Sequence, residues 1–370
     1  MPASRDRLRK PLIQYRFSMS QQWMIYGATG YSGSLIAKAA KQAGLTPTLA
    51  GRSKEKVKRL ADELGLPWCC FSLDDAKNAK AKLDSMTLML NCAGPFSQTA
   101  EHAMSACLAS KTHYLDITGE IAVFELASGL SDKARQAGVL LCPGVGFDVI
   151  PTDCVAATLK QALPDAEQLH LGFDSKSRLS PGTAKTSVEG LKMGGKVREN
   201  SEIKAVPFAY RTRQVDFGDG QKLAMTIPWG DVSTAYHTTR IPNIEVYVPA
   251  SPRLVKRMKK LNWVRPVLGW SWVQKRLKAQ IDKKVTGPSV AAREESPMYV
   301  WGEATNAKGD KVQARVKTPN GYTVTQDGAL AVVQHVLNTP DTGYHTPASL
   351  VGAELLSQLP GCSAIETHRI

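Results

Sequence analysis

A glycine-rich turn near the start of the chain places the strongest constraint on its fold. Gly27, Gly30 and Gly33 follow the apolar run 23–26 and precede the Ala-rich stretch 35–40. A strand, a glycine turn and a helix in this order are typical of a dinucleotide site, because the turn lets the backbone approach a pyrophosphate and the helix N-terminus offers N–H groups. We therefore predict cofactor contacts from Gly27, Thr29, Gly30, Tyr31, Ser32 and Gly33.

The end of the next apolar run, 46–50, indicates which dinucleotide binds. NAD sites usually carry Asp or Glu at this point, where the carboxylate holds the ribose hydroxyls. Here the sequence is Gly51-Arg52-Ser53-Lys54. A guanidinium binds phosphate through two parallel hydrogen bonds, so we predict NADP(H) as the cofactor, with Arg52 and Ser53 on its 2′-phosphate. The alternative is that Arg52 is a solvated turn residue.

The hydrophobic pattern divides the chain into two parts. Strand and helix patterns alternate over 19–162, which predicts an α/β domain with a Rossmann-type, doubly wound parallel sheet. Over 163–320 β-rich runs dominate, apart from a helical pattern at 183–195, and predict an α+β domain with a largely antiparallel sheet for substrate contacts or dimerisation. We expect the helices of 321–370 to pack back on the first domain, and residues 1–18 to be a disordered tail.

Three loops at predicted strand ends are candidates for the rest of the site, because ligands of doubly wound sheets bind outside the carboxyl ends of strands. The first supplies candidate cofactor contacts: Asn91, Ala93, Gly94 and Pro95. Asp116 and Asp148, in the other two, are the candidate catalytic residues. The neighbours of Asp116, Thr118 and Glu120, could instead cap the following helix. Asp148 has no local structural explanation, and as a general acid it would need a raised pKa.

The positive charge of the chain is local. The formal net charge is +14, but residues 253–284 hold eleven Lys or Arg and one acid. Leu254, Met258, Leu261 and Val264 recur there at helical spacing, Pro266 is expected to break the helix, and Trp270 and Trp272 follow. A basic amphipathic helix with Trp is typical of a membrane surface, and a helical pair packed on the second domain is the alternative. Since the body of the chain is near neutral, we expect no nucleic-acid partner. We expect no metal site, because the His and Cys residues lack paired metal spacing.

Several motifs together resemble a known family. They are GATGYSG at Gly27, AGRS at Ala50, NCAGPF at Asn91, HYLDITGE at His113, GFDVIPTD at Gly146, TPNGYTVT at Thr318 and HTPASLVGAELL at His345. The chain resembles the saccharopine dehydrogenase-like oxidoreductases, especially the branch that includes the trans-acting enoyl reductases. The resemblance covers roughly 22–368 and implies a Rossmann domain followed by an α+β domain for substrate contacts and often dimerisation.

We therefore expect an NADP(H)-dependent oxidoreductase that transfers hydride to an enoyl, acyl or isoprenoid-like substrate. The alternatives are a non-catalytic protein that senses NADP or binds a lipid surface, and an amino-acid dehydrogenase. We expect a cytoplasmic protein, with 253–284 as the candidate for peripheral contact with the inner membrane surface, and we expect a homodimer from the resemblance.

Overall fold

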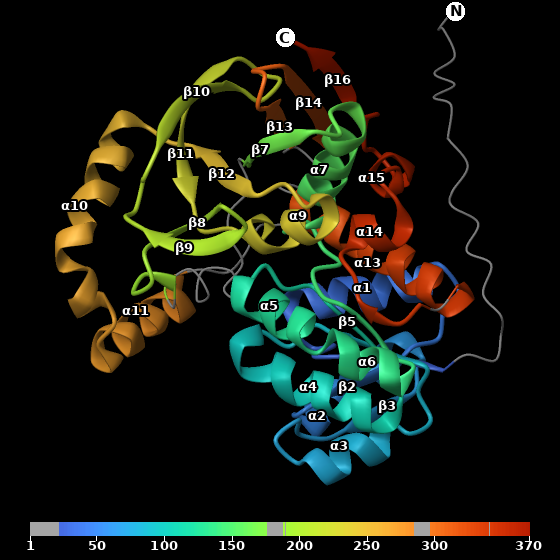
Figure 1. The fold of residues 1–370 in the computed structure, drawn as a ribbon. Helices are drawn as coiled ribbons and strands as arrows, with labels where there is room; N and C mark the ends of the chain where they lie inside the picture. Colours follow the sequence, from blue (N-terminus) through green and yellow to red (C-terminus); the bar gives the residue numbers. More distant parts are fainter. Residues whose placement is uncertain (1–21, 176–187, 189, 285–296, 340) are drawn as a thin grey trace, which may run out of the picture.

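The computed structural model describes residues 22–175, 188, 190–284, 297–339 and 341–370 (Figure 1). The predicted tail 1–18 lies outside these residues, as do 183–187 and 189 of the predicted helix over 183–195. Residues 188 and 190 are helical, 191–193 form a turn, and a strand begins at Gly195, so the predicted helix extended too far.

The first sheet is parallel and carries helices on both faces. Its elements run in the order β1 (Trp23–Tyr26), α1 (Tyr31–Gln42), β2 (Thr48–Gly51), α2 (Lys54–Leu64), β3 (Trp68–Cys70), α3 (Ala76–Leu83), β4 (Leu88–Asn91), α4 (Phe96–Ser110), β5 (His113–Asp116), α5 (Ile121–Gly129), α6 (Ser131–Ala137) and β6 (Leu140–Cys142). The spatial order is β6-β5-β4-β1-β2-β3, with the short β15 (Gly343–Tyr344) beside β6. This order is that of the dinucleotide-binding fold, so the predicted Rossmann-type sheet is confirmed.

The central strands of this sheet are apolar on both sides because helices cover both faces. Ile25 and Leu90 belong to the core on one face. Met24 and Met89, one residue earlier in the same strands, belong to the core on the other face.

The second sheet is mixed and larger. Its elements are β7 (Ala166–Asp174), β8 (Gly195–Glu199), β9 (Glu202–Val206), β10 (Thr212–Asp216), β11 (Gln221–Ile227), β12 (Asn243–Pro249), β13 (Met298–Asn306), β14 (Lys311–Thr318) and β16 (Glu366–Arg369). The order is β10-β11-β12-β7-β13-β14-β16; β8 pairs with β12, and β9 pairs with β8. Among the strand pairs in the described residues, only β12–β7 is parallel, so the predicted largely antiparallel sheet is confirmed.

Helix α7 (Ile150–Ala162) leaves the first sheet and packs on the second. Gly302 of β13 permits the close approach, since a Cβ there would lie 2.6 Å from Val155 and 2.7 Å from Leu159. Helix α7 therefore joins the two sheets in two ways: it links them along the chain, and it packs closely on the second sheet.

The C-terminal segment also connects the two sheets. Helix α13 (Gly321–Asn338) packs against α1, and the Tyr322 ring meets the Tyr31 ring edge-on at 4.9 Å. Beyond it β15 extends the first sheet, whereas β16 extends the second. The sequence predicted helices for this segment and did not predict its two strands.

Asp153 joins α7 to α9 (Asp231–Thr239) and α14 (Pro347–Val351). Its buried carboxylate accepts a hydrogen bond from the Thr238 hydroxyl at 2.5 Å and another from the Ala348 N–H at 2.8 Å. Three segments distant in sequence therefore meet at one side chain.

We predict that Asp153→Ala lowers the free energy of unfolding by about 2–4 kcal/mol, because it leaves the buried Ala348 N–H without its acceptor and removes one hydrogen bond of the Thr238 hydroxyl. Urea denaturation followed by circular dichroism measures the change. The exposed Asp132, which pairs with Arg135 on the surface, gives the control Asp132→Ala, expected within about 0.5 kcal/mol. Equal effects of the two substitutions would contradict the assignment.

Candidate functional site

The glycine turn packs tightly against the loop after β4. Gly27 has φ +76°, and a Cβ there would lie 2.6 Å from the Ala93 nitrogen; a Cβ on Gly33 would lie 2.4 Å from the Gly27 carbonyl oxygen. Both positions therefore require glycine, one for the turn and one for the approach of α1. The intervening Thr29 and Gly30 are exposed, and Tyr31 and Ser32 are half-buried at the N-terminus of α1. This arrangement suits a pyrophosphate.

The end of β2 offers an unpaired positive charge. Arg52 is exposed and forms no salt bridge within the described residues, and Ser53 begins α2 without a side-chain cap. Both groups are thus available to a phosphate at the edge where β1 also ends.

The loop after β4 is held from behind by Asn91. This side chain is fully buried, accepts a hydrogen bond from the Ala93 N–H at 3.0 Å and donates to the Tyr114 hydroxyl at 3.3 Å. Asn91 therefore shapes the loop, while Gly94 is exposed and Ala93 and Pro95 are half-buried. The predicted cofactor contacts of this loop lie beside the glycine turn.

Glu120 directly precedes α5, but its side chain caps the N-terminus of α4. Its carboxylate accepts hydrogen bonds from the Phe96 N–H at 2.9 Å and the Ser97 N–H at 2.8 Å, at the start of α4. A carboxylate is favourable at a helix N-terminus, so Glu120 ties the loop after β5 to the loop after β4.

Asp116 is a positioning residue. One carboxylate oxygen accepts from the N–H groups of Thr118 and Gly144, both at 2.9 Å, and the other accepts from the Tyr114 hydroxyl at 2.7 Å. Burial raises the pKa of Asp116 to about 6. Because the side chain is fully buried and already bonded, this geometry does not support the predicted catalytic role.

Asp148 differs from Asp116 in having no such partners. Its carboxylate lies against Gly119, where a Cβ would approach one oxygen to 2.8 Å. It is half-buried and accepts no hydrogen bond within the described part of the chain. Burial raises the pKa of Asp148 to about 6. A carboxyl of this kind can hold a proton near neutral pH and present it to a ligand.

Three aromatic side chains, which the sequence analysis did not select, form a wall beside Asp148. The Trp229 indole N–H donates to the Asp148 carbonyl oxygen at 2.9 Å. The Phe173 ring lies 4.8 Å from the Trp229 ring and 5.8 Å from the Phe147 ring, between centroids. Phe173 is the last residue but one of β7 and Trp229 follows β11, so the second sheet contributes two of the three rings. The alternating run 168–173, which ends at Phe173, was the available sequence signal.

A second acid, Asp231, is buried near Asp148. Neither carboxylate oxygen of Asp231 has a hydrogen-bond partner of normal geometry in the residues that the structure describes. Burial raises the pKa of Asp231 well above its usual value, and the nearby Asp153 and Asp148 raise it further. The surroundings of Asp148 are therefore aromatic and acidic.

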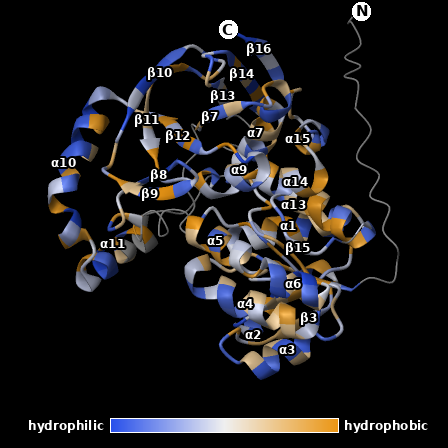
Figure 2. Cartoon of the chain, in the orientation of Figure 1, coloured by the Kyte–Doolittle hydropathy of each residue, from blue (hydrophilic) through white to orange (hydrophobic). Residues whose placement is uncertain are grey.

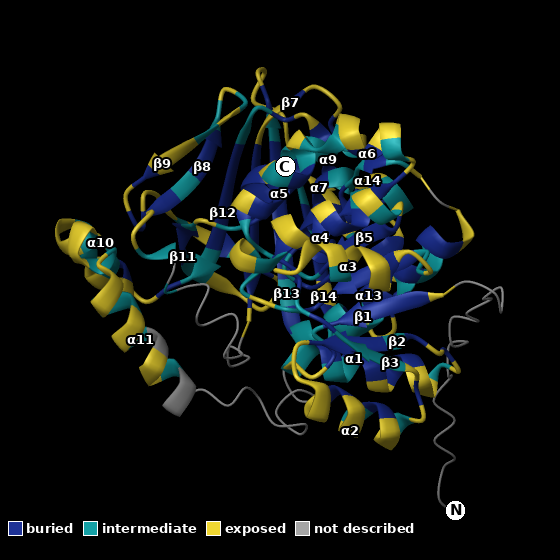
Figure 3. Ribbon diagram, turned by 90° about the horizontal axis from the view of Figure 1, so that it is seen from below, coloured by how far each residue is buried: buried dark blue, intermediate teal, exposed yellow. Residues whose placement is uncertain are grey.

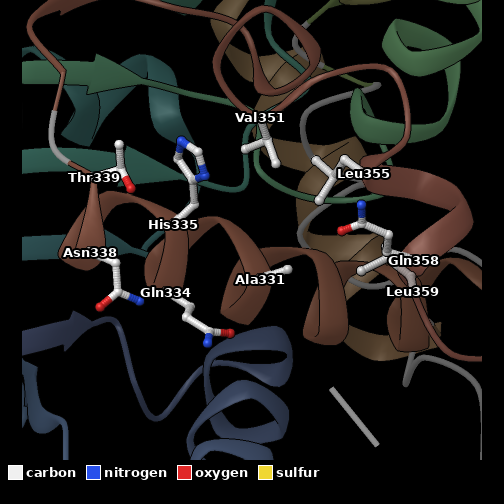
Figure 4. A pocket seen from close by; sticks show the side chains of 9 residues that line it. All are labelled: Ala331, Gln334, His335, Asn338, Thr339, Val351, Leu355, Gln358 and Leu359. Atoms are coloured by element: carbon white, nitrogen blue, oxygen red, sulfur yellow. The ribbon is translucent and has the colours of Figure 1, made fainter. Parts of the chain in front are cut away.

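A hollow of about 250 Å³ lies elsewhere, along the C-terminal half of α13 (Figure 4). His335 and Gln334 of α13 line it together with Val351 and Leu355. None of the predicted site residues borders it, so it is separate from the candidate site. Among the described residues, no group of three or more His, Cys, Asp or Glu side chains could hold a metal ion.

The fold and the glycine turn define a dinucleotide-binding protein, and comparison with known proteins gives its class. Residues 23–142 match the saccharopine dehydrogenase NADP-binding domain family. The saccharopine dehydrogenase-like oxidoreductase of Rattus norvegicus is 29% identical over 217 residues, which cover 50% of each chain. The trans-acting enoyl reductase of Mycobacterium bovis is 27% identical over 204 residues, 51% of this chain and 49% of that protein. The matches thus span about half the length of these relatives.

The fold comparison extends over nearly the whole chain. Apo saccharopine dehydrogenase (L-Glu forming) from Saccharomyces cerevisiae has a TM-score of 0.65 at 9% identity, covering 95% of this chain and 100% of that one. At this identity the likeness concerns the fold alone. Residues 23–142 are similar to the NADP-binding domain of the saccharopine dehydrogenase family, and the predicted resemblance and cofactor are confirmed.

We predict that Gly27→Ala abolishes NADPH binding, because the new Cβ meets the backbone at Ala93 and the turn must move. Gly44 has a similar φ of +78° but nothing within 4 Å of its Cβ position. The control Gly44→Ala therefore carries only the conformational cost of about 1–2 kcal/mol and should leave NADPH affinity unchanged. Fluorescence titration with NADPH measures both. Unaltered binding by Gly27→Ala would contradict the assigned turn.

We also predict that Arg52→Ala raises the Kd for NADPH about 30-fold, which corresponds to one charge-assisted contact with the 2′-phosphate, and leaves the Kd for NADH unchanged. Arg59, exposed on α2, gives the control Arg59→Ala. If Arg52→Ala weakened both cofactors equally, the 2′-phosphate assignment would be wrong.

Proposed function

We propose that this protein is an NADP(H)-dependent oxidoreductase that reduces an apolar, conjugated substrate such as an enoyl, acyl or isoprenoid-like group. The observation that carries the proposal is the Asp148 carboxyl, free of hydrogen bonds in the described structure, with a raised pKa and an aromatic wall beside it. It follows β6, on the same edge of the sheet as the glycine turn that follows β1.

In this proposal some residues bind the cofactor and the substrate, and Asp148 supplies the proton. The glycine turn and the N-terminus of α1 bind the pyrophosphate, and Arg52 and Ser53 bind the 2′-phosphate. When bound, NADPH supplies the hydride. Trp229, the partly exposed ring of the wall, contacts a flat apolar substrate, and the buried rings of Phe147 and Phe173 support it and exclude water. Asp148 donates the proton that reduction of a conjugated double bond requires.

The chemistry around Asp148 favours this substrate class over an amino acid. An amino-acid dehydrogenase needs a positive charge for the substrate carboxylate. The described groups next to Asp148 are aromatic rings, Gly119 and the buried acid Asp231, and none of these groups carries a positive charge that could bind a carboxylate. The relative named trans-acting enoyl reductase supports the enoyl substrate. Homodimer formation and a cytoplasmic location stay predictions.

We predict that Asp148→Asn lowers kcat for enoyl reduction about 100-fold, a typical loss for a general acid, without changing the Kd for NADPH. The Asp148 carboxyl is protonated below its pKa of about 6, so wild-type kcat/KM should fall as the pH rises through that value. The variant should lose this pH dependence. NADPH oxidation with trans-2-dodecenoyl-CoA as the probe, from pH 5 to 8, measures both.

The matched control is Asp132→Asn, which makes the same change at an exposed position. Full activity of Asp148→Asn would exclude Asp148 as the proton donor. NADPH binding by wild-type protein without turnover of enoyl, keto-acid or amino-acid substrates would favour a cofactor-sensing protein. Turnover of amino acids alone would favour the amino-acid dehydrogenase.

A further inference from the structure

The helices α10 (Pro252–Leu268) and α11 (Ser271–Lys284) form an arm on the outside of the second sheet. Figures 1 and 3 show the arm at the edge of the molecule, on the side away from the helices of the first sheet. Figure 3 shows most of α10 exposed, and Figure 2 shows apolar residues among its hydrophilic ones. The two helices are thus available to a partner.

One face of α10 packs on the second sheet. Val255 is buried in a cluster with Ala209 and Met225. The Asn262 side chain accepts from the Phe208 N–H at 2.8 Å and donates to the Phe208 carbonyl oxygen at 3.3 Å. The predicted apolar face is therefore divided in the structure: Met258 packs inward, whereas Leu254 and Val264 are exposed. Pro266 lies inside the helix and does not break it.

The outward face of α10 forms a stripe in two halves. Residues three and four apart share a helix face, and the residues opposite Val255 follow this spacing. They are Arg253, Lys256, Arg257, Lys260, Trp263, Val264 and Val267. The first four are basic and the last three are apolar, so charge and apolar surface are separated along the helix.

The apolar half continues into α11. Trp263 is 89% exposed; Trp270, just before α11, is 53% exposed, and Trp272, at its start, is 58% exposed. With Val264 and Val267 they form what we term the tryptophan corner. An exposed apolar cluster of this size marks a site of interaction. Among the described residues, none of the helices has the length and apolarity needed to cross a bilayer.

We propose that the tryptophan corner inserts into the surface of an anionic lipid bilayer, with the basic half of the stripe on the lipid headgroups. Trp side chains are favoured at the boundary between headgroups and acyl chains, and basic residues are attracted to anionic lipids. Residues 252–281 contain no acidic residue, so nothing within this segment opposes that attraction. The inference goes beyond the proposed redox function and does not depend on it.

The charge distribution favours a bilayer over a second copy of the chain. A two-fold symmetric contact brings the same surface of each copy together. Two corners in contact would bring two basic stripes close to each other, and their repulsion would oppose association. An anionic lipid surface complements both halves of the stripe.

Co-sedimentation with vesicles tests the proposal. The full-length protein should bind vesicles of 70% phosphatidylcholine and 30% phosphatidylglycerol, and should bind pure phosphatidylcholine at least about tenfold more weakly, given several bases at the surface. Lys256→Glu/Lys260→Glu should weaken binding to the anionic vesicles at least about 30-fold. Trp263→Ala/Trp270→Ala/Trp272→Ala should weaken it at least about 30-fold through lost apolar contact.

The matched control is Lys77→Glu/Lys133→Glu, which makes the same change of charge at exposed positions of the first domain. This control should bind the anionic vesicles at least about tenfold more tightly than Lys256→Glu/Lys260→Glu does. NADPH titration should be unchanged in every variant, which shows that each one is folded. Equal vesicle binding by wild type and the tryptophan variant would overturn the proposal. A tryptophan variant that changed only from dimer to monomer in light scattering would assign the corner to a second copy.

Discussion

A buried chain of hydrogen bonds across the ends of three neighbouring strands organises the candidate site. The Ala93 N–H donates to Asn91, Asn91 donates to the Tyr114 hydroxyl, and Tyr114 donates to Asp116, which also accepts from the Gly144 N–H. These bonds fix the loops after β4, β5 and β6 relative to one another. Since Gly27 packs directly on Ala93, the same chain also supports the glycine turn. Buried polar networks in which each member is bonded are rigid, and this rigidity places Asp148 beside the cofactor edge.

The parts of the site that could be predicted from sequence are those whose cause is local. The glycine spacing between a strand and a helix, and the basic Arg52 at the next strand end, each carry their chemistry within a few residues. The alternating pattern of strands and helices also predicted the first sheet, because a parallel sheet with helices on both faces needs that pattern. Pro266 shows the limit of such rules: it lies close to the end of α10, where α10 accommodates it before ending at Leu268.

The remainder depends on contacts between distant segments. Asp116 ends β5 and Asp148 follows β6. The N–H groups of Thr118 and Gly144 and the hydroxyl of Tyr114 make the first a positioning residue, and the contacts with Gly144 and Tyr114 could not be read from the sequence. The aromatic wall joins Phe147, Phe173 and Trp229, which lie in three different segments. Likewise, the helical spacing of Leu254 and Val264 left open whether this face of α10 packs on the second domain or meets a membrane surface. In the structure Asn262 bonds to Phe208, Val255 is buried, and Leu254 and Val264 are exposed.

The two sheets therefore contribute different parts of the candidate site. The first sheet binds the cofactor and holds Asp148, whereas the second supplies Phe173 and Trp229 and, on its outside, the arm with the tryptophan corner. Helix α7 and Asp153 fix one sheet to the other, so a protein held at a lipid surface by its arm would keep the aromatic wall and the cofactor edge in a constant relation. An apolar substrate drawn from the same lipid would then be concentrated near the aromatic wall. This would give a physical reason why the second sheet carries both the tryptophan corner and part of the aromatic wall.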